Sequence, residues 1–472
     1  MRKRDSIRDF LNGILRKLIK AAPRFELGIK DLQSSALPLG HAATQVVNAF
    51  GWHKDFTTVD SIKNQNKSLL VISNGHGEDL IALRILEAIH EQKPDLKIEI
   101  LPLVGQGKVF EEAIHNNWLI KIGPSLRLPS GGFSNQSLRA LFADIFAGLF
   151  LMTWKQWLYV KWAGSNGRVI LAVGDLLPLF FAWTSKACFG FIGTPKSDYT
   201  WKSSFGTKIS DYYHYLKGTE WDPWEWILMK SGRCKMVGIR DQLTARGLIR
   251  KGVKAICFGN PMMDGFKAIS FPYEFKQARR LLLLCGSRNP EALDNLRRLM
   301  ESVIQIRTDK DIVLLIALGS EPIPLDVDSL LNKLGFSKSS NNVIESDAYY
   351  ERERFKVFVG VGRFYSWASI AEVGIANAGT ATEQLVGSGV PSLSLPGKGP
   401  QFQYSFAIRQ SRLLGGAVIP CKSSKQLALR LEFLLKNTQF RNNLSHIGFR
   451  RMGPQGASKL LASSVLKSLL DV

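Results

Sequence analysis

The sequence lacks the signatures of several large protein classes. Its five cysteines (Cys188, Cys234, Cys257, Cys285 and Cys421) lie apart, with neither a CxxC pair nor metal-ligand spacing, which favours free thiols in a reducing compartment. No GxGxxG fingerprint and no Walker A sequence follows a strand, so a nicotinamide or flavin enzyme and a P-loop NTPase are disfavoured. The N-terminus lacks a secretory signal pattern, and we therefore expect a cytoplasmic protein.

Acidic residues are outnumbered by basic ones: the chain has 40 Asp and Glu but 62 Lys and Arg, which gives a net charge of +22. This excess favours an anionic partner, although a merely basic soluble protein explains it as well. No finger spacing or aromatic RNP-type strand accompanies the charge, so we expect no nucleic-acid partner.

No uncharged apolar run reaches the length of a membrane span, but residues 138–163 come close, with three Trp, one Tyr and scattered Lys and Arg. This pattern is typical of a helix that lies in the interface of an anionic membrane. A buried helix with a Trp-rich face is the alternative. We therefore expect a protein that is peripheral on the inner face of the membrane, if the first interpretation holds.

The first sixty residues have a different character from the remainder. Residues 1–20 have the spacing of a basic amphipathic helix, whereas residues 22–42 resemble the translated reverse strand of a bacterial cysteine transfer-RNA gene. We therefore treat residues 1–64 as an N-terminal extension and expect residues 1 to about 60 to result from a mis-assigned translation start.

From residue 67 onward, buried strands alternate with helices, which predicts parallel α/β domains. The chain is too long for one ordinary core. We expect a first Rossmann-like domain over 65–266, a linker over 267–278, a second Rossmann-like domain over 279–445 and a C-terminal helix over 446–472 that packs back on the first domain. The fold class predicted is thus α/β, with two Rossmann-like domains facing each other across a cleft.

The most specific stretch is 375–404, IANAGTATEQLVGSGVPSLSLPGKGPQFQY. It is typical of a strand, a glycine turn and a helix whose first amides bind an anion. Glu383 is placed to accept hydrogen bonds from two ribose hydroxyls, so the stretch predicts a nucleotide-sized site.

This stretch resembles the donor-site signature of GT-B glycosyltransferases, and residues 68–460 resemble the lipid-A-disaccharide synthase family, including related cyanobacterial proteins of unassigned acceptor. Four further stretches carry the resemblance in order: the loop 74–79, Gly174-Asp175, the segment 259–264 and the segment 284–291. The presence of His76 in the first loop and Asn260 in the third segment departs from the family pattern, which puts the acceptor in doubt.

The resemblance implies an inverting, metal-independent transfer of a sugar from a nucleotide-sugar donor, with UDP as the expected nucleotide, to a lipid acceptor. Asp175 is the first candidate for the catalytic base and His76 the second; a helix-capping carboxylate and a loop histidine bonded to backbone are the respective alternatives. The expected donor-binding residues are Gly286, Ser287, Arg288, Gly379, Thr380, Ala381, Glu383, Gln401 and Gln403. The expected acceptor loop comprises Asn74, Gly75, Gly77 and Glu78. We expect neither a metal nor another cofactor.

Two other functions remain open. A UDP-N-acetylglucosamine 2-epimerase shares the two-domain architecture but needs no acceptor and no membrane surface. A catalytically silent, membrane-associated binding protein of the same fold is the second alternative.

Overall fold

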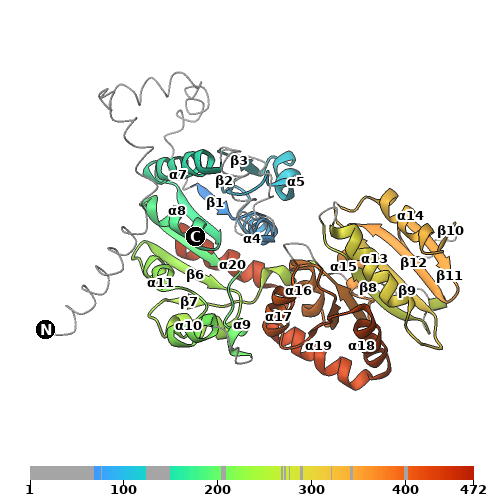
Figure 1. The fold of residues 1–472 in the computed structure, drawn as a ribbon. Helices are drawn as coiled ribbons and strands as arrows, with labels where there is room; N and C mark the ends of the chain where they lie inside the picture. Colours follow the sequence, from blue (N-terminus) through green and yellow to red (C-terminus); the bar gives the residue numbers. More distant parts are fainter. Residues whose placement is uncertain are drawn as a thin grey trace, which may run out of the picture. The chain divides into compact units, whose positions relative to one another are not determined.

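The computed structural model describes residues 68–75, 77–123, 149–203, 209–266, 269, 273–275, 277–287, 291–319, 321–340, 344–397 and 402–471. The predicted extension and the first eleven residues of the Trp-rich stretch 138–163 lie outside these residues. Residues 66–472 form one compact unit, which contains two α/β sheets (Figure 1).

The first sheet has seven parallel strands in the order β3-β2-β1-β4-β5-β6-β7. Four of its strands, β1, β2, β4 and β5, are buried at every position and consist mainly of apolar residues, as expected for parallel strands covered on both faces. The strands are β1 Leu69–Ser73, β2 Ile98–Pro102, β3 Leu119–Lys121, β4 Val169–Gly174, β5 Phe189–Gly193, β6 Cys234–Ile239 and β7 Ala255–Ile256.

The second sheet has eight strands in the order β10-β11-β12-β9-β8-β13-β14-β15. Its parallel part begins at β12, and β10 and β11 extend it as an antiparallel edge. The strands are β8 Arg279–Leu284, β9 Ile312–Leu318, β10 Ser337–Ser339, β11 Ala348–Arg352, β12 Phe355–Val361, β13 Val373–Ala376, β14 Ser392–Ser394 and β15 Val418–Pro420.

Both sheets are doubly wound, and this determines where ligands bind. In each sheet the first strand lies between the second and the fourth of its parallel strands, so the strand order reverses between β1 and β4 and between β8 and β13. Open α/β sheets bind ligands at the carboxyl ends of the strands that flank this reversal. The loops after β1, β4, β8 and β13 are therefore the places to search for a site.

Helices connect the strands and cover the sheets. Those of the first sheet are α4 Gly77–Gln92, α5 Glu111–His115, α7 Leu149–Ser165, α8 Leu176–Thr184, α9 Tyr199–Lys202, α10 Ile209–Lys217, α11 Pro223–Met229 and α12 Gln242–Ile249. Those of the second are α13 Glu291–Ile304, α14 Pro324–Lys333, α15 Phe364–Ala368, α16 Thr380–Gly387, α17 Tyr404–Leu413, α18 Ser424–Lys436 and α19 Thr438–Met452. No helix in the described ranges is both long and apolar enough to cross a membrane.

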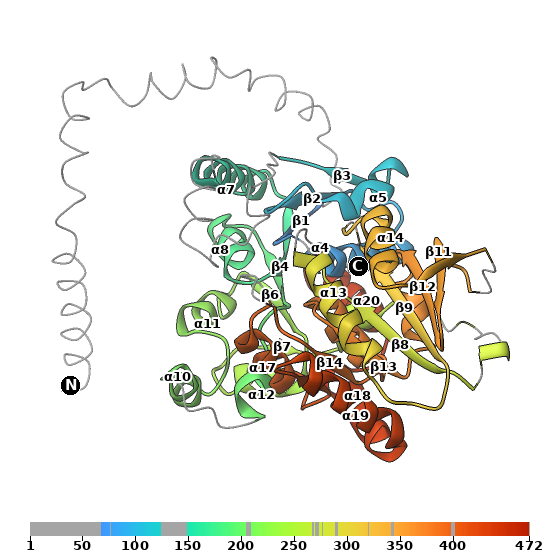
Figure 2. The same cartoon turned by 45° about the vertical axis from the view of Figure 1, so that its right-hand side comes forward.

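The C-terminal helix α20, Ala457–Val465, returns to the first sheet and packs against α4 (Figures 1 and 2). The Asp264 carboxylate accepts hydrogen bonds from the backbone amides of Gly456 and Ser458 at its start. Leu461 and Val465 are buried in the same hydrophobic cluster as Ile85 of α4. The predicted boundary at 445/446 falls inside α19, and the chain turns toward the first sheet only after Met452.

Close packing between α16 and α19 yields a stability prediction. Gly448 of α19 lies so close to α16 that an added Cβ would overlap the carbonyl oxygen of Val386. Replacing a helical glycine by alanine ordinarily stabilises by about 1 kcal/mol, but here overpacking by about 1–3 kcal/mol acts against it. We expect Gly448→Ala to lower the free energy of unfolding in urea denaturation.

Gly232→Ala is the matched control, because an added Cβ there meets no atom within 4 Å. Equal midpoints for the two variants would contradict the close approach of α16 and α19.

Candidate functional site

The loop after β1 leads directly into α4, and two contacts fix its position. The Ser73 hydroxyl donates a hydrogen bond of 2.5 Å to the buried Asp79 carboxylate, which joins the last residue of β1 to the first turn of α4. Gly174, at the end of β4, has a φ of 137° and a Cβ built on it would lie 2.8 Å from the Cβ of Asn74. Only glycine allows this close approach, which brings the loop 74–77 beside the end of β4.

Asp175 follows β4 and is the N-cap of α8. One carboxylate oxygen, Oδ1, accepts a hydrogen bond of 3.1 Å from the Leu177 amide. The side chain is partly buried and lies close enough to Glu78 to raise the pKa of that group. Asp175 thus has the capping function named as the alternative to a catalytic base, and its carboxylate also faces the first loop.

Glu78 has an unusual ionisation. Its pKa is raised from 4.5 to about 7: burial is the largest cause and the neighbouring carboxylates of Asp175 and Asp79 add to it, whereas hydrogen bonds act in the opposite direction. The Thr194 hydroxyl, directly after β5, lies 3.5 Å from Glu78 Oε1. Glu78, predicted as a residue of the acceptor loop, is therefore a carboxyl that exchanges its proton near neutral pH.

A buried ion pair connects the carboxyl edges of the two sheets. Arg240 follows β6, and its Nη2 lies 2.7 Å from Oε2 of Glu383 in α16, with side-chain exposures of 6% and 15%. Arg240 Nη1 also donates to the Thr194 carbonyl at 3.3 Å. Glu383, predicted to bind ribose, is held by this arginine in the structure.

The start of α16 is built as the sequence predicts. Gly379 is its N-cap and Thr380 and Ala381 form its first turn, whose amides have no partner within the helix. The Gln410 side chain of α17 donates to the carbonyls of Ala378 and Gly379 at 3.3 and 3.0 Å and holds the turn in place.

This helix start lies beside the first loop. A Cβ built on Gly77 would be 3.0 Å from Thr380 Oγ1, and Gln384 donates to the carbonyl of Met262 at 2.9 Å. The structure therefore brings together the predicted acceptor loop, Asp175 and the helix-start part of the predicted donor site.

The other predicted donor residues lie at different positions. Gly286 and Ser287 lie in the loop after β8, where Gly286 has a φ of 96° and Ser287 is exposed. Gln403 is the exposed residue before α17 and makes no capping bond. His76, Arg288 and Gln401 lie outside the described residues.

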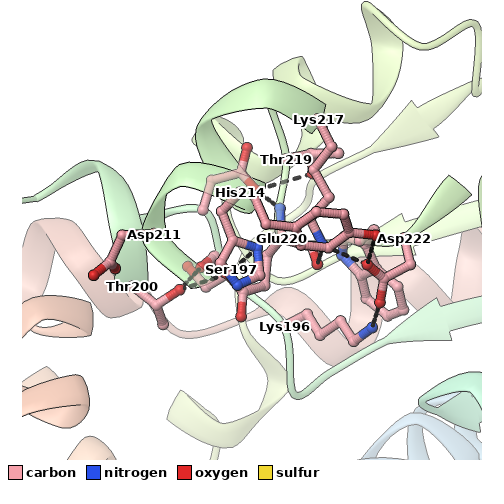
Figure 3. A network of polar contacts seen from close by, with 12 residues as sticks. Lys196, Ser197, Thr200, Asp211, His214, Lys217, Thr219, Glu220 and Asp222 are labelled. Carbon is pink, nitrogen blue, oxygen red and sulfur yellow. Dashed lines mark hydrogen bonds and ion pairs between the residues drawn. The ribbon is translucent and has the colours of Figure 1, made fainter. Parts of the chain in front are cut away.

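The connection between β5 and β6 contains an extended polar network (Figure 3). Lys196 binds the carboxylates of Glu225 and Asp222 at 2.6 and 3.3 Å, and Lys217 binds Asp222 at 2.5 Å. The Thr200 hydroxyl donates to Glu220 at 2.9 Å. These contacts fix the segment that begins with Thr194.

The same segment contacts α17 of the second sheet by two ion pairs. Arg409 lies 2.7 Å from Glu220, and Arg412 lies 3.1 Å from Asp211. His214 lies 3.5 Å from Glu220, and burial lowers the pKa of this histidine. The ionisable network thus bridges the two sheets at a second place, in addition to Arg240 and Glu383.

Two site residues were missed by the sequence reasoning, Thr194 and Arg240. Each directly follows a buried strand, FGFIG in one case and KMVGI in the other. The rule that parallel sheets bind ligands at the carboxyl ends of their strands was sufficient to find them.

Two other features of the described residues lie outside this site or are absent. A cavity of about 270 Å³ lies at the opposite, amino-terminal edge of the first sheet, lined by Arg168, Val169, Cys188 and Lys235 among others. Within the described ranges, no group of three His, Cys, Asp or Glu side chains is arranged to hold a metal ion. The candidate site is therefore the place where the loop after β1, Asp175 and the start of α16 converge.

No protein-family model matches the chain, and no curated protein sequence matches it. Several solved structures, however, are similar to the chain in fold. A Listeria monocytogenes protein described as a UDP-N-acetylglucosamine 2-epimerase matches with a TM-score of 0.50 at 14% identity, over 86% of this chain and 97% of its own. The Staphylococcus aureus protein MnaA with UDP matches with a TM-score of 0.50 at 12% identity, over 85% and 96%. The spinosyn rhamnosyltransferase SpnG with its aglycone has a TM-score of 0.47 at 15% identity, over 84% and 99%.

The chain has the GT-B fold. The first two matches cover nearly the whole of each solved structure, and the two doubly wound sheets described above are the two Rossmann-like domains of that fold. The predicted fold class is confirmed. At these identities the similarity extends to the fold alone.

The raised pKa of Glu78 predicts a pH-dependent stability. Between pH 4.5 and about 7, the folded protein retains a proton that the unfolded chain has lost, so this group's contribution to stability is present at low pH and disappears as the pH rises through 7. Glu78→Gln removes the ionisation. Relative to wild type, we expect the variant to be more stable at pH 8 than at pH 5 by up to about 3 kcal/mol, as measured by urea unfolding at both pH values.

Glu91→Gln, at an exposed position of the same helix, is the control for loss of a carboxylate from α4. A Glu78→Gln difference that does not change with pH would show that Glu78 has an ordinary pKa.

Proposed function

We propose that this protein is a glycosyltransferase that moves a sugar from a nucleotide-sugar donor, with UDP as the nucleotide, to a lipid or lipid-linked acceptor. The observation that carries the proposal is the convergence of the α16 start with the loop after β1, where a carboxyl with a pKa near 7 stands beside Thr194 and Asp175. Transfer requires an anion site for the leaving diphosphate and a proton acceptor for the incoming hydroxyl, and this arrangement supplies candidates for both.

The donor side of the proposal uses α16. The unpaired amides and positive dipole end of a helix start favour a diphosphate, and the buried Arg240 guanidinium is held by Glu383 in the first turn of the same helix. In this proposal Arg240 adds positive charge near the leaving group, and Glu383 exchanges part of its contact with Arg240 for ribose hydroxyls. The S. aureus protein of the same fold was solved with UDP, which supports a uridine nucleotide here.

The acceptor side of the proposal uses the outer helices of the first domain. Successive turns of α7 expose Phe150, Leu151, Trp154 and Leu158. Helix α8 packs against both α7 and α11. These neighbouring helices, α8 and α11, expose Phe180, Trp224 and Ile227. Exposed apolar side chains on three neighbouring helices of a protein of net charge +22 suit an anionic membrane and a lipid acceptor. A nucleotide-sugar epimerase needs no such surface.

The first test is binding and turnover of a panel of nucleotide sugars, with and without a total lipid extract, in excess chelator. We expect a UDP-sugar to bind and release of UDP to depend on lipid, because the acceptor is a lipid and the reaction needs no metal. Turnover to the C2 epimer without lipid would establish the epimerase instead, and binding of no nucleotide sugar would overturn the proposal.

A charge variant tests the donor site at α16. Thr380→Glu places an anion at the helix start, where it keeps the helix stable but repels a diphosphate, and we expect the donor dissociation constant to rise at least tenfold. Thr438→Glu, the same change at the first residue of α19, is the matched control. Calorimetric titration with UDP measures both, and equal affinities would exclude the α16 start as the anion site.

The membrane surface is tested by flotation with liposomes that contain anionic lipid. Phe150→Glu combined with Trp154→Glu removes apolar area and adds negative charge, so we expect salt-sensitive flotation of the wild type and at least tenfold less bound variant. Leu429→Glu, at an exposed leucine of α18, is the control. Failure of the wild type to float would remove the membrane from the proposal while leaving donor binding to be judged by the first test.

A further inference from the structure

Glu78 lies where four strand ends of the first sheet converge. It is in the first turn of α4, directly after the loop that follows β1. Asp175 from the end of β4 and Thr194 from the end of β5 are its neighbours, and Arg240 from the end of β6 is close enough for Glu78 to raise its pKa. A side chain at this position faces the region where α/β sheets bind their ligands.

Among the described residues, none places a cationic group in direct contact with the Glu78 carboxyl. Arg240 directs Nη2 to Glu383 and Nη1 to the Thr194 carbonyl. In the part of the chain that the structure describes, no lysine or arginine nitrogen forms an ion pair with Glu78. With respect to the described lysines and arginines, the carboxyl can gain and lose a proton without breaking a salt bridge.

Glu78 is also adjacent to the donor side. The residue before it, Gly77, approaches Thr380 so closely that a Cβ there would lie 3.0 Å from the threonine hydroxyl. The Glu78 carboxyl therefore stands near the place where α16 would hold a diphosphate, on the side of the first domain. A base must occupy such a position, close to the anomeric carbon and on the acceptor side.

We propose that Glu78 is the catalytic base of the proposed transfer, and that Asp175 is a positioning residue beside it. The inference rests on the proposed function. Glu78 takes the proton from the acceptor hydroxyl as that oxygen forms a bond to the anomeric carbon. The bond from the anomeric carbon to the phosphate oxygen breaks, and its electron pair leaves with the nucleoside diphosphate. Glu78 then loses its proton to solvent.

The surroundings of Glu78 suit this step better than those of Asp175. Asp175 uses Oδ1 to cap α8, which restricts its carboxylate. The charged groups that surround Glu78 are Asp79 on its own helix, Asp175 before α8, Arg240 after β6 and, through that arginine, Glu383 of α16. Burial and the two aspartates raise the pKa of Glu78 to about 7, and a base titrating near the working pH is the most effective.

The experiment compares transfer by wild type, Glu78→Gln, Glu78→Asp and the control Glu91→Gln between pH 5 and 9. We expect the wild-type kcat to rise with pH through a midpoint near 7. Glu78→Gln should lose at least a hundredfold in kcat and lose this rise, since a general base contributes about 10²–10⁴-fold. Glu78→Asp should restore part of the rate with a shifted midpoint, and Glu91→Gln should match the wild type.

A donor-binding titration on each variant separates chemistry from folding and from donor recognition. We expect Glu78→Gln to bind UDP within threefold of the wild type, which a misfolded variant would not do. Full transfer by Glu78→Gln with an unchanged pH profile would overturn the assignment and leave the glycosyltransferase proposal intact. A wild type that binds no nucleotide sugar would instead overturn the proposed function, and this assignment with it.

Discussion

The buried contact between Arg240 and Glu383 is the interaction on which the arrangement of the site depends. A guanidinium that is 6% exposed must find a carboxylate, because an unpaired buried charge is very costly. The arginine comes from the end of β6 and the glutamate from the first turn of α16, so satisfying one charge brings the functional edges of both sheets together. The same arginine also holds the Thr194 carbonyl, and thereby fixes the neighbour of Glu78.

Parallel topology explains why so many polar groups gather at this place. Four strands of the first sheet, β1, β4, β5 and β6, are each followed directly by a polar residue, namely Asn74, Asp175, Thr194 and Arg240. Burial at this edge, together with the nearby carboxylates of Asp175 and Asp79, raises the pKa of Glu78. The site forms here because parallel strands all have their carboxyl ends at the same edge of the sheet. The sheet also holds these residues more rigidly than a loop alone would.

The fold could be predicted from sequence because buried parallel strands are continuous apolar runs, and LLVIS, VILAVG and VGIA are each unmistakable. The donor-side helix start was predictable from its glycine turn. The ion pair between Arg240 and Glu383 could not be predicted, because it joins residues 143 positions apart and depends on how the two domains pack. The antiparallel edge β10–β11 was missed because SKS and AYYER lack a buried run.

The return of α20 to α4 gives the chain two crossings between its domains, one between β7 and β8 and one between α19 and α20. Two domains that are joined by two separate crossings rotate most easily about the line through those crossings, which is then the hinge axis. Two crossings therefore favour opening by a single rotation and oppose twisting or sliding. The second crossing leads directly into α20, which packs on the same α4 that contains Glu78 in its first turn.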